Sequence, residues 1–174
     1  LPLPRPLAET GARVYRHAGP PAWELRIVPV LCHDASTGMP HPDTVQVAFG
    51  GDRMSGCGGA PLALLTGPEW RVGDIAGTSA IDGARVTLGF QAEGPSVAGR
   101  GGCNRYAAPL TLTGEGLSVG QAVATRMACA PLLMEQERRF FDALAAVRRF
   151  DIDATGALLL LDAADRPVIR ARRD

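Results

Sequence analysis

The sequence predicts an α+β protein in which one main helix accompanies a mostly antiparallel sheet. Many short segments alternate apolar and polar residues, and turns rich in glycine or proline separate them, which indicates strands joined by hairpins. One segment, residues 131–148, instead repeats its apolar residues every three or four positions, as an amphipathic helix does. Many short strands followed by a single late helix are typical of the α+β class.

The first 66 residues are predicted to form a β-rich region. Trp23, Leu25 and Ile27 alternate with polar neighbours, and Gly50-Gly51-Asp52 supplies a hairpin turn. The opening Leu-Pro-Leu-Pro-Arg-Pro favours an extended conformation, and residues 32–42 have the composition of a loop. The expected strands are residues 13–16, 23–30, 44–49 and 53–57.

Residues 67–174 are predicted to hold the helix and the remaining strands. Pro131 stands in the first turn of the helix, where no amide donor is missed. Glu135 and Glu137 lie toward the positive end of the helix dipole, and Arg148 and Arg149 lie at its negative end. The apolar face holds Leu133, Phe140, Phe141, Leu144 and Val147. The expected strands are residues 70–75, 84–90, 96–99, 109–112, 117–119, 123–127, 150–152, 158–161 and 168–170.

Length and charge limit the classes of function. A chain of 174 residues can hold two small domains with cores of their own, and we divide it into residues 1–66 and 67–174. The first part has five acidic and five basic residues and the second has thirteen of each, so neither part carries the basic field of a nucleic-acid-binding protein. The longest apolar runs, such as Ala157 to Leu161, are far shorter than the roughly 20 residues of a transmembrane helix.

The four cysteines favour disulfides and an oxidising compartment. Cys32 and Cys57 lie in the first part, and Cys103 and Cys129 lie in the second. Free thiols and a metal site are the alternatives, but metal sites usually show closely spaced pairs such as C-x-x-C, and none occurs. Disulfides persist in exported proteins. Because the chain opens at Leu1 without a methionine, we expect a trimmed export product, in the periplasm or at the outer membrane, with a lipid anchor as one means of attachment.

The second part resembles the META domain family, which includes the HslJ-type envelope lipoproteins of bacteria. Residues 96–106 end in Gly-Gly-Cys-Asn-Arg-Tyr and resemble the family's G-x-x-G-C-N-x-Y turn. Residues 124–129 resemble its T-x-M-x-C segment, which E-x-x-F follows; here those residues are Glu137 and Phe140. Trp70 near the start of the region also fits. The resemblance covers about residues 68–172, and it departs at Ala107-Ala108-Pro109, where the family usually has a glycine near a second aromatic residue.

This resemblance implies a partly barrel-like sheet with a helix packed against it, usually exported, often lipid-anchored and without catalytic activity. The first part has a weaker resemblance to the C-terminal part of an uncharacterised family of bacterial envelope proteins. Four features carry it: Leu25-Arg26-Ile27, Cys32-His33-Asp34, the proline before Thr44, and Gly56-Cys57. That family has a longer β-rich region ahead of the matching stretch. We therefore expect residues 1–66 to be a β-rich appendage or a small domain.

Five polar and aromatic residues beside the second cysteine pair are candidates for binding: Asn104, Arg105, Tyr106, Thr125 and Arg126. A disulfide between Cys103 and Cys129 would join the two segments that carry them and make a rigid recognition patch. The alternative is that the Gly-Gly-Cys-Asn turn has only a structural role. Glycine allows the positive φ that a turn needs, and the asparagine side chain can form hydrogen bonds with nearby backbone.

Three further groups have a chemical and a structural interpretation. Cys32, His33, Asp34, Met39 and His41 include metal ligands within ten residues, but an exposed loop with a disulfide cysteine is favoured. Residues 151–156 resemble the opening of a calcium loop with Asp162 at its twelfth position, but a turn is favoured. The closing arginines suit either anionic lipid or a solvated tail; these are Arg170, Arg172 and Arg173.

The functional expectation is a non-enzymatic, exported META-domain protein with a binding or structural role in envelope stress or drug tolerance. No partner nucleophile is evident for His33, because Ser36 and Ser55 lack the context of a catalytic serine. We expect no cofactor, no metal and a monomer, with an envelope protein or a lipid as partner. The alternative is a pilotin-like carrier that holds a lipid or a partner peptide beside the helix, with Phe140, Phe141 and Leu144 as lining residues.

Overall fold

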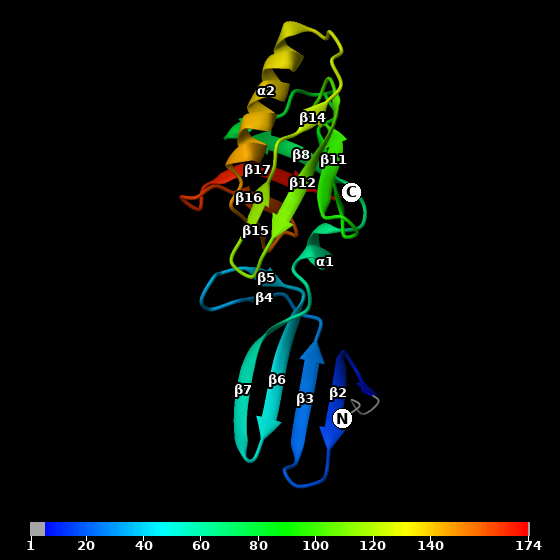
Figure 1. Cartoon of the computed structure of the whole chain (residues 1–174), viewed down its shortest axis with the longest axis vertical. Coiled ribbons are helices and arrows are strands. Elements are labelled where there is room, and N and C mark those ends of the chain that lie inside the picture. The colour runs from blue at the N-terminus through cyan, green and yellow to red at the C-terminus, as the bar shows by residue number, and fades with distance from the viewer. Residues whose placement is uncertain (1–5, 174) are drawn as a thin grey trace. The chain divides into compact units, whose positions relative to one another are not determined.

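The computed structural model describes residues 6–173 of the chain (Figure 1). The predicted extended opening therefore lies, apart from Pro6, outside the described residues. Contacts divide the chain into two compact units, Leu1–Leu64 and Leu65–Asp174. Within the described part of the chain, no helix is long and apolar enough to cross a membrane.

The first unit is built on one antiparallel sheet with the order β1-β2-β3-β6-β7. Its strands are β1 (Leu7–Glu9), β2 (Ala12–His17), β3 (Trp23–Val28), β6 (Asp43–Phe49) and β7 (Asp52–Gly58). The predicted loop at 32–42 contains a two-stranded ribbon, β4 (Cys32–His33) with β5 (Pro40–His41). The composition of residues 32–42 predicts a loop because turn-forming residues dominate it. In the structure these residues form the turn between the two short strands, where the Asp34 carboxylate accepts the amides of Ser36 and Thr37.

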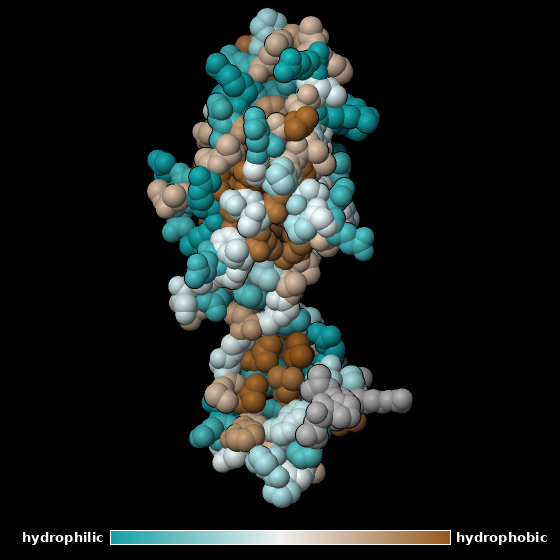
Figure 2. All heavy atoms as spheres, viewed as in Figure 1, coloured by the Kyte–Doolittle hydropathy of each residue, from teal (hydrophilic) through white to brown (hydrophobic). Residues whose placement is uncertain are grey.

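One face of this sheet is apolar, as the alternation of Trp23, Leu25 and Ile27 predicts. Figure 2 shows apolar side chains gathered over β3 and β6. The register places Val47 beside Leu25 and Val45 beside Ile27, and these side chains are only half-buried. A sheet in a single layer buries few side chains, so the backbone ladder and the Cys32–Cys57 disulfide contribute a large share of the stability of this unit.

The second unit is built on a ten-stranded antiparallel sheet and the main helix. Eight strands follow the order β13-β12-β11-β10-β8-β17-β16-β15, with β14 beside β12 and β9 beside β8. The strands are β8 (Trp70–Ile75), β9 (Thr78–Ser79), β10 (Thr87–Gln91), β11 (Ser96–Arg100), β12 (Arg105–Leu112), β13 (Leu117–Val119), β14 (Val123–Ala124), β15 (Arg149–Ile152), β16 (Leu158–Leu161) and β17 (Pro167–Arg172). The helices are α1 (Leu62–Leu65), where the chain passes from one unit to the other, and α2 (Pro131–Ala146).

The sheet curls until its two outer strands nearly meet. The Leu117 amide on β13 donates to the carbonyl of Arg148, just before β15, at 2.8 Å. Helix α2 packs against β8, β13 and β17 (Figure 1). Its Phe140 and Leu144 side chains are fully buried in the core. The α+β class with a barrel-like, mostly antiparallel sheet and one main helix is thereby confirmed.

Several predicted boundaries are wrong, each for a local reason. The helix ends at Ala146 rather than 148, because Val147 turns to an extended ψ of 132° and the Arg148 amide pairs with the Leu161 carbonyl of β16. Strand β12 begins at Arg105, four residues before the predicted start at Pro109. The strand predicted at 123–127 is only two residues long, and the strand predicted at 84–90 begins at Thr87.

The end of the chain is anchored to the start of the second unit, so the solvated tail predicted at Arg173 is wrong. The Arg173 guanidinium donates to the carbonyls of Leu65, Thr66 and Pro68 and lies 3.9 Å from the centre of the Trp70 ring. The indole of Trp70 also donates to the Leu65 carbonyl at 2.9 Å. Leu65 itself is fully buried.

These contacts predict where the second unit can be cut. A fragment of residues 62–174 should unfold cooperatively. A fragment that begins at Pro68 should lose at least about 2 kcal/mol of stability, because it lacks the buried Leu65 side chain and the Leu65 and Thr66 carbonyls that accept bonds from Trp70 and Arg173. Thermal unfolding followed by circular dichroism measures both. Equal midpoints for the two fragments would show that this anchor adds nothing.

Candidate functional site

The Gly-Gly-Cys-Asn turn joins β11 to β12 and is held by a buried carboxylate. Glu137 and Asn104 each expose only 7% of their surface. The Glu137 carboxylate accepts the backbone amides of Cys103 at 3.1 Å and Asn104 at 2.6 Å, and the Asn104 side-chain amide at 2.6 Å. Gly101 has to be glycine here, because a Cβ would lie 2.9 Å from Glu137 Cγ.

The other end of the Asn104 side chain holds the segment before the helix. Its Oδ1 accepts the Thr125 hydroxyl at 2.9 Å and the Met127 amide at 2.7 Å. The predicted disulfide between Cys103 and Cys129 is present and joins the same two segments. Met127 therefore bonds to Asn104 instead of extending β14, which is why the strand predicted at 123–127 stops at Ala124.

The structure brings only some of the five predicted binding residues together. Asn104 in the turn accepts the hydroxyl of Thr125 in the segment before the helix, as in the structural alternative. The Tyr106 ring is buried and packs edge-on against Phe140 at 5.3 Å between centroids. Arg105 and Arg126 are exposed. Of the five, Arg105 and Tyr106 line a cleft.

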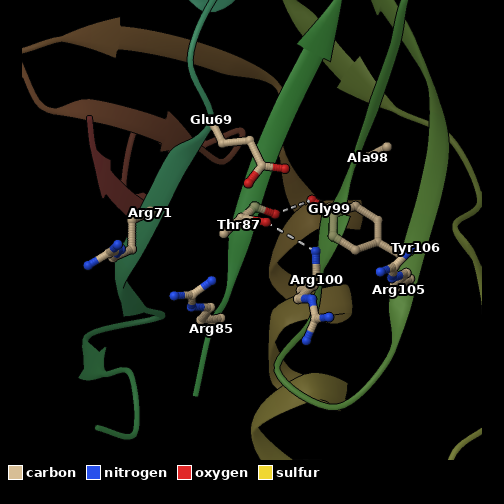
Figure 3. Close-up of a pocket in the computed structure, with 9 residues that line it drawn as sticks. All are labelled: Glu69, Arg71, Arg85, Thr87, Ala98, Gly99, Arg100, Arg105 and Tyr106. Atoms are coloured by element: carbon tan, nitrogen blue, oxygen red, sulfur yellow. Dashed lines mark hydrogen bonds between the residues drawn. The ribbon is translucent and has the colours of Figure 1, made fainter. Parts of the chain in front are cut away.

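That cleft lies on the outer side of the sheet and is rich in arginine. Its volume is about 760 Å³. Its lining residues are Glu69, Arg71, Arg85, Thr87, Ala98, Gly99, Arg100, Arg105 and Tyr106. Figure 3 shows the four arginine side chains distributed from β8 across to β12. One carboxylate faces four guanidinium groups, so the cleft is strongly positive in a chain whose formal net charge is zero.

The cleft opens where the ladder between β10 and β11 is interrupted. Regular pairing stops at Gly89 opposite Ala98, and side chains replace the missing backbone bonds at Thr87 (Figure 3). The Tyr106 hydroxyl donates to the Thr87 carbonyl at 2.9 Å, and the Arg100 amide donates to the Thr87 hydroxyl oxygen at 3.2 Å. Gly99 allows this close approach, because a Cβ there would lie 2.3 Å from the Thr87 oxygen.

The buried Tyr106 phenol and the arginines of the cleft both hold their protons. Burial raises the pKa of the Tyr106 phenol well above its ordinary value, and the nearby Glu69 charge adds to the effect. Tyr106 therefore stays neutral and donates a hydrogen bond. The positive charge of the cleft comes from arginine, which holds its proton throughout the physiological range.

Sequence reasoning missed Glu69, Arg71, Arg85 and Arg100. The sequence does hold a signal that these arginines face outward, namely the alternation of apolar and polar residues that predicts the strands. Trp70 and Val72 are buried, so Arg71 between them points outward; in the same way Arg85 precedes the buried Val86 and Arg105 precedes the buried Tyr106. Which outward residues become neighbours depends on strand order, and the alternation alone does not give that order.

The candidate metal ligands of the first unit have other roles. Cys32 is bonded to Cys57, as predicted from the cysteine pairs. Met39 is fully buried, and His41 Nδ1 lies 3.0 Å from the Gly59 carbonyl oxygen. Among residues 6–173, no group of three or more histidine, cysteine or acidic side chains is placed to hold a metal ion.

The Asp-rich stretch at 151–156 forms the favoured turn. Asp153 Oδ1 accepts the hydroxyl and amide of Thr155 and the amide of Ala157, and its Oδ2 pairs with Arg170 at 2.6 Å. These bonds, led by that of the Thr155 hydroxyl, lower the pKa of Asp153 to about 2. Asp162 pairs with Arg166 instead of facing this turn.

The second unit is similar in sequence to a known family, and the chain is similar in fold to solved structures. The META domain family matches residues 63–174. The chain belongs to this family. An NMR structure of a protein from Burkholderia xenovorans is 26% identical, covers 64% of this chain and 86% of its own, and has a TM-score of 0.51. A second NMR structure, 22% identical, covers 63% of this chain and 92% of its own with a TM-score of 0.50, which shows the fold alone. Comparison with curated proteins found no match.

The buried network predicts a large effect at Asn104. Asn104→Ala should lower the free energy of unfolding by about 3 kcal/mol or more, because it leaves the Thr125 hydroxyl and the Met127 amide without their acceptor and removes a donor from a buried carboxylate. Urea unfolding measures the loss, with Gln121→Ala on an exposed site as the matched control. A loss no larger than that of the control would contradict a supporting role for Asn104.

The lowered pKa of Asp153 predicts a pH dependence of stability. The ordinary pKa is 3.8 and the folded value is about 2. The ionised form therefore stabilises the fold above about pH 4, and this contribution disappears as the pH falls toward 2. Asp153→Asn should flatten the change in stability between these values, as measured by urea unfolding at several pH values. Asp82→Asn, at an exposed turn, is the control and should retain the slope of the parent protein.

Proposed function

We propose that this META-domain protein is a non-enzymatic binding protein of the bacterial cell envelope, exported to the periplasm or the outer membrane, with a role in envelope stress or drug tolerance. The observation that carries the proposal is the pair of disulfides, Cys32–Cys57 and Cys103–Cys129. Each unit has its own, and every cysteine of the chain is paired. Such bonds persist in oxidising compartments and are rare in the cytosol.

The chemistry of the cleft supports binding rather than catalysis. Its charged groups are arginines and Glu69, and arginine neither accepts a proton nor attacks a substrate. Thr87 already accepts the Arg100 amide, and the Tyr106 phenol donates to a backbone carbonyl and keeps its proton. A nucleophile with a neighbouring base, which covalent catalysis requires, does not occur among the residues that line the cleft.

The carrier is the second candidate, and an apolar surface beside α2 favours it. Phe141 and Leu144 line a depression of about 460 Å³ beside the loop after β13, while Phe140 is core. Between β14 and the first turn of the helix, four apolar side chains are exposed: Val123, Met127, Leu132 and Met134. Exposed apolar side chains of this size are found on surfaces that meet a lipid or a partner protein.

Fractionation of the native host tests export. The protein should appear in the envelope fraction, and its intact mass should not change when thiols are alkylated without prior reduction. After reduction, four alkyl groups should add, one for each cysteine. A cytosolic protein with reactive thiols would overturn the proposal.

The same intact mass under native conditions separates the two candidates. A lipid-sized adduct that Phe141→Ser removes, and that Leu112→Ser on β12 leaves in place, would favour the carrier. A protein without such an adduct favours a binding protein that acts through its polar surface.

A further inference from the structure

We propose that the arginine cleft binds a ligand that carries two or more phosphate groups, in a site that spans several strands. This inference deepens the proposed function and rests on it for the source of the ligand. The proposal rests on a row of arginines, which the pairing of the strands places side by side on the outer face of the sheet.

The row runs straight across neighbouring strands. Arg100 on β11 lies directly opposite Arg105 on β12. Arg100 is joined to Thr87 on β10 by a hydrogen bond, and Thr87 lies opposite Arg71 on β8. Arg172 on β17 lies opposite Arg71 and extends the row. With strands about 4.8 Å apart, the backbone from β8 to β12 covers roughly 14 Å.

This arrangement opposes folding instead of helping it. Like charges placed directly opposite on neighbouring strands destabilise a sheet, and Arg100 and Arg105 are such a pair. Arg85, Arg100 and Arg105 form no ion pair within residues 6–173. Elsewhere in this unit the protein does pair its arginines, as Arg166 and Arg170 show. An anion bound across the row would relieve the repulsion.

The geometry favours several phosphate groups over one small anion. A single phosphate can take the bidentate bonds of two neighbouring guanidinium groups, such as Arg100 and Arg105. Arg71 lies two strands farther along the row, so a second phosphate group is needed to reach it. Phosphate offers three acceptor oxygens and up to two charges per group, more than a carboxylate brings to the same arginines.

Nucleic acid shares this chemistry but fits the cleft less well. Proteins that bind single strands add exposed aromatic side chains on which bases stack. The one aromatic residue of the cleft, Tyr106, is buried and packs against the helix. The ligand class is therefore a phosphorylated lipid headgroup, glycan or small molecule.

The test uses the full oxidised chain and two double variants that remove the same charge. Arg100→Gln with Arg105→Gln shortens the row, and Arg53→Gln with Arg138→Gln is the control at exposed sites outside it. Inositol hexakisphosphate should raise the unfolding midpoint of the parent and the control. The row variant should bind it at least about tenfold more weakly by calorimetry. Inorganic phosphate should bind the parent more weakly than the hexakisphosphate does, because one group cannot span the row.

The unliganded variant separates a binding role from a structural one. Without ligand and at low salt, the row variant should unfold at the same temperature as the parent or higher, since a like-charge pair is gone. A lower midpoint would overturn the proposal, because the two arginines would then support the fold. An equal loss of hexakisphosphate binding in the row and control variants would also overturn the proposal. So would binding of citrate to the parent protein as tight as that of the hexakisphosphate.

Two further arms identify the source of the phosphate. Binding to vesicles of phosphatidylcholine with cardiolipin, but not to phosphatidylcholine alone, supports a lipid headgroup; hexakisphosphate binding without vesicle binding supports a soluble ligand. Tighter binding of a single-stranded oligonucleotide would overturn the ligand class. These measurements on the purified protein stand apart from fractionation, so a failure of anion binding leaves export intact and a cytosolic location leaves the binding result intact.

Discussion

The buried carboxylate of Glu137 is the interaction on which the second unit depends. A carboxylate removed from water is costly unless hydrogen bonds replace its hydration, and here three N–H groups from the turn do so. The dependence is mutual, because the turn's amides would otherwise be buried without acceptors. One side chain of α2 therefore fixes the position of the β11–β12 hairpin, and through Asn104 also that of the segment that leads into the helix.

This arrangement gives the most recognisable sequence motif of the chain a supporting role. The Gly-Gly-Cys-Asn turn uses its polar groups internally, and the residues that flank it, Arg100 and Arg105, carry its charge into the cleft. Holding the hairpin from the inside keeps these two arginines side by side despite their repulsion. The turn therefore has a structural role, and its rigidity fixes the positions of the two arginines that line the cleft.

Much of this fold could be predicted, because burial follows strand alternation closely. Val86, Leu88 and Phe90 are all buried, as a strand with one inner face requires. Boundaries failed where a long-range bond overrides the local pattern, as at Val147, where the chain leaves the helix to enter the sheet. The role of Glu137 also escaped prediction, since its partners lie more than thirty residues away.

The arginine row lies beyond what one sequence can give, for a geometrical reason. Alternation tells which side of a strand a residue takes, but the neighbours of Arg71 follow from an order in which β17 and β10 flank β8. The total charge hides the row as well. Acidic residues and arginines are equal in number over the chain, while strand order brings four arginines together at the cleft. Each like-charge contact at an exposed site costs only about 1 kcal/mol or less, so the fold can carry the row. A repulsion that the core and the buried carboxylate can outweigh, and that an anion would relieve, is the expected pattern of a surface kept for binding rather than for stability.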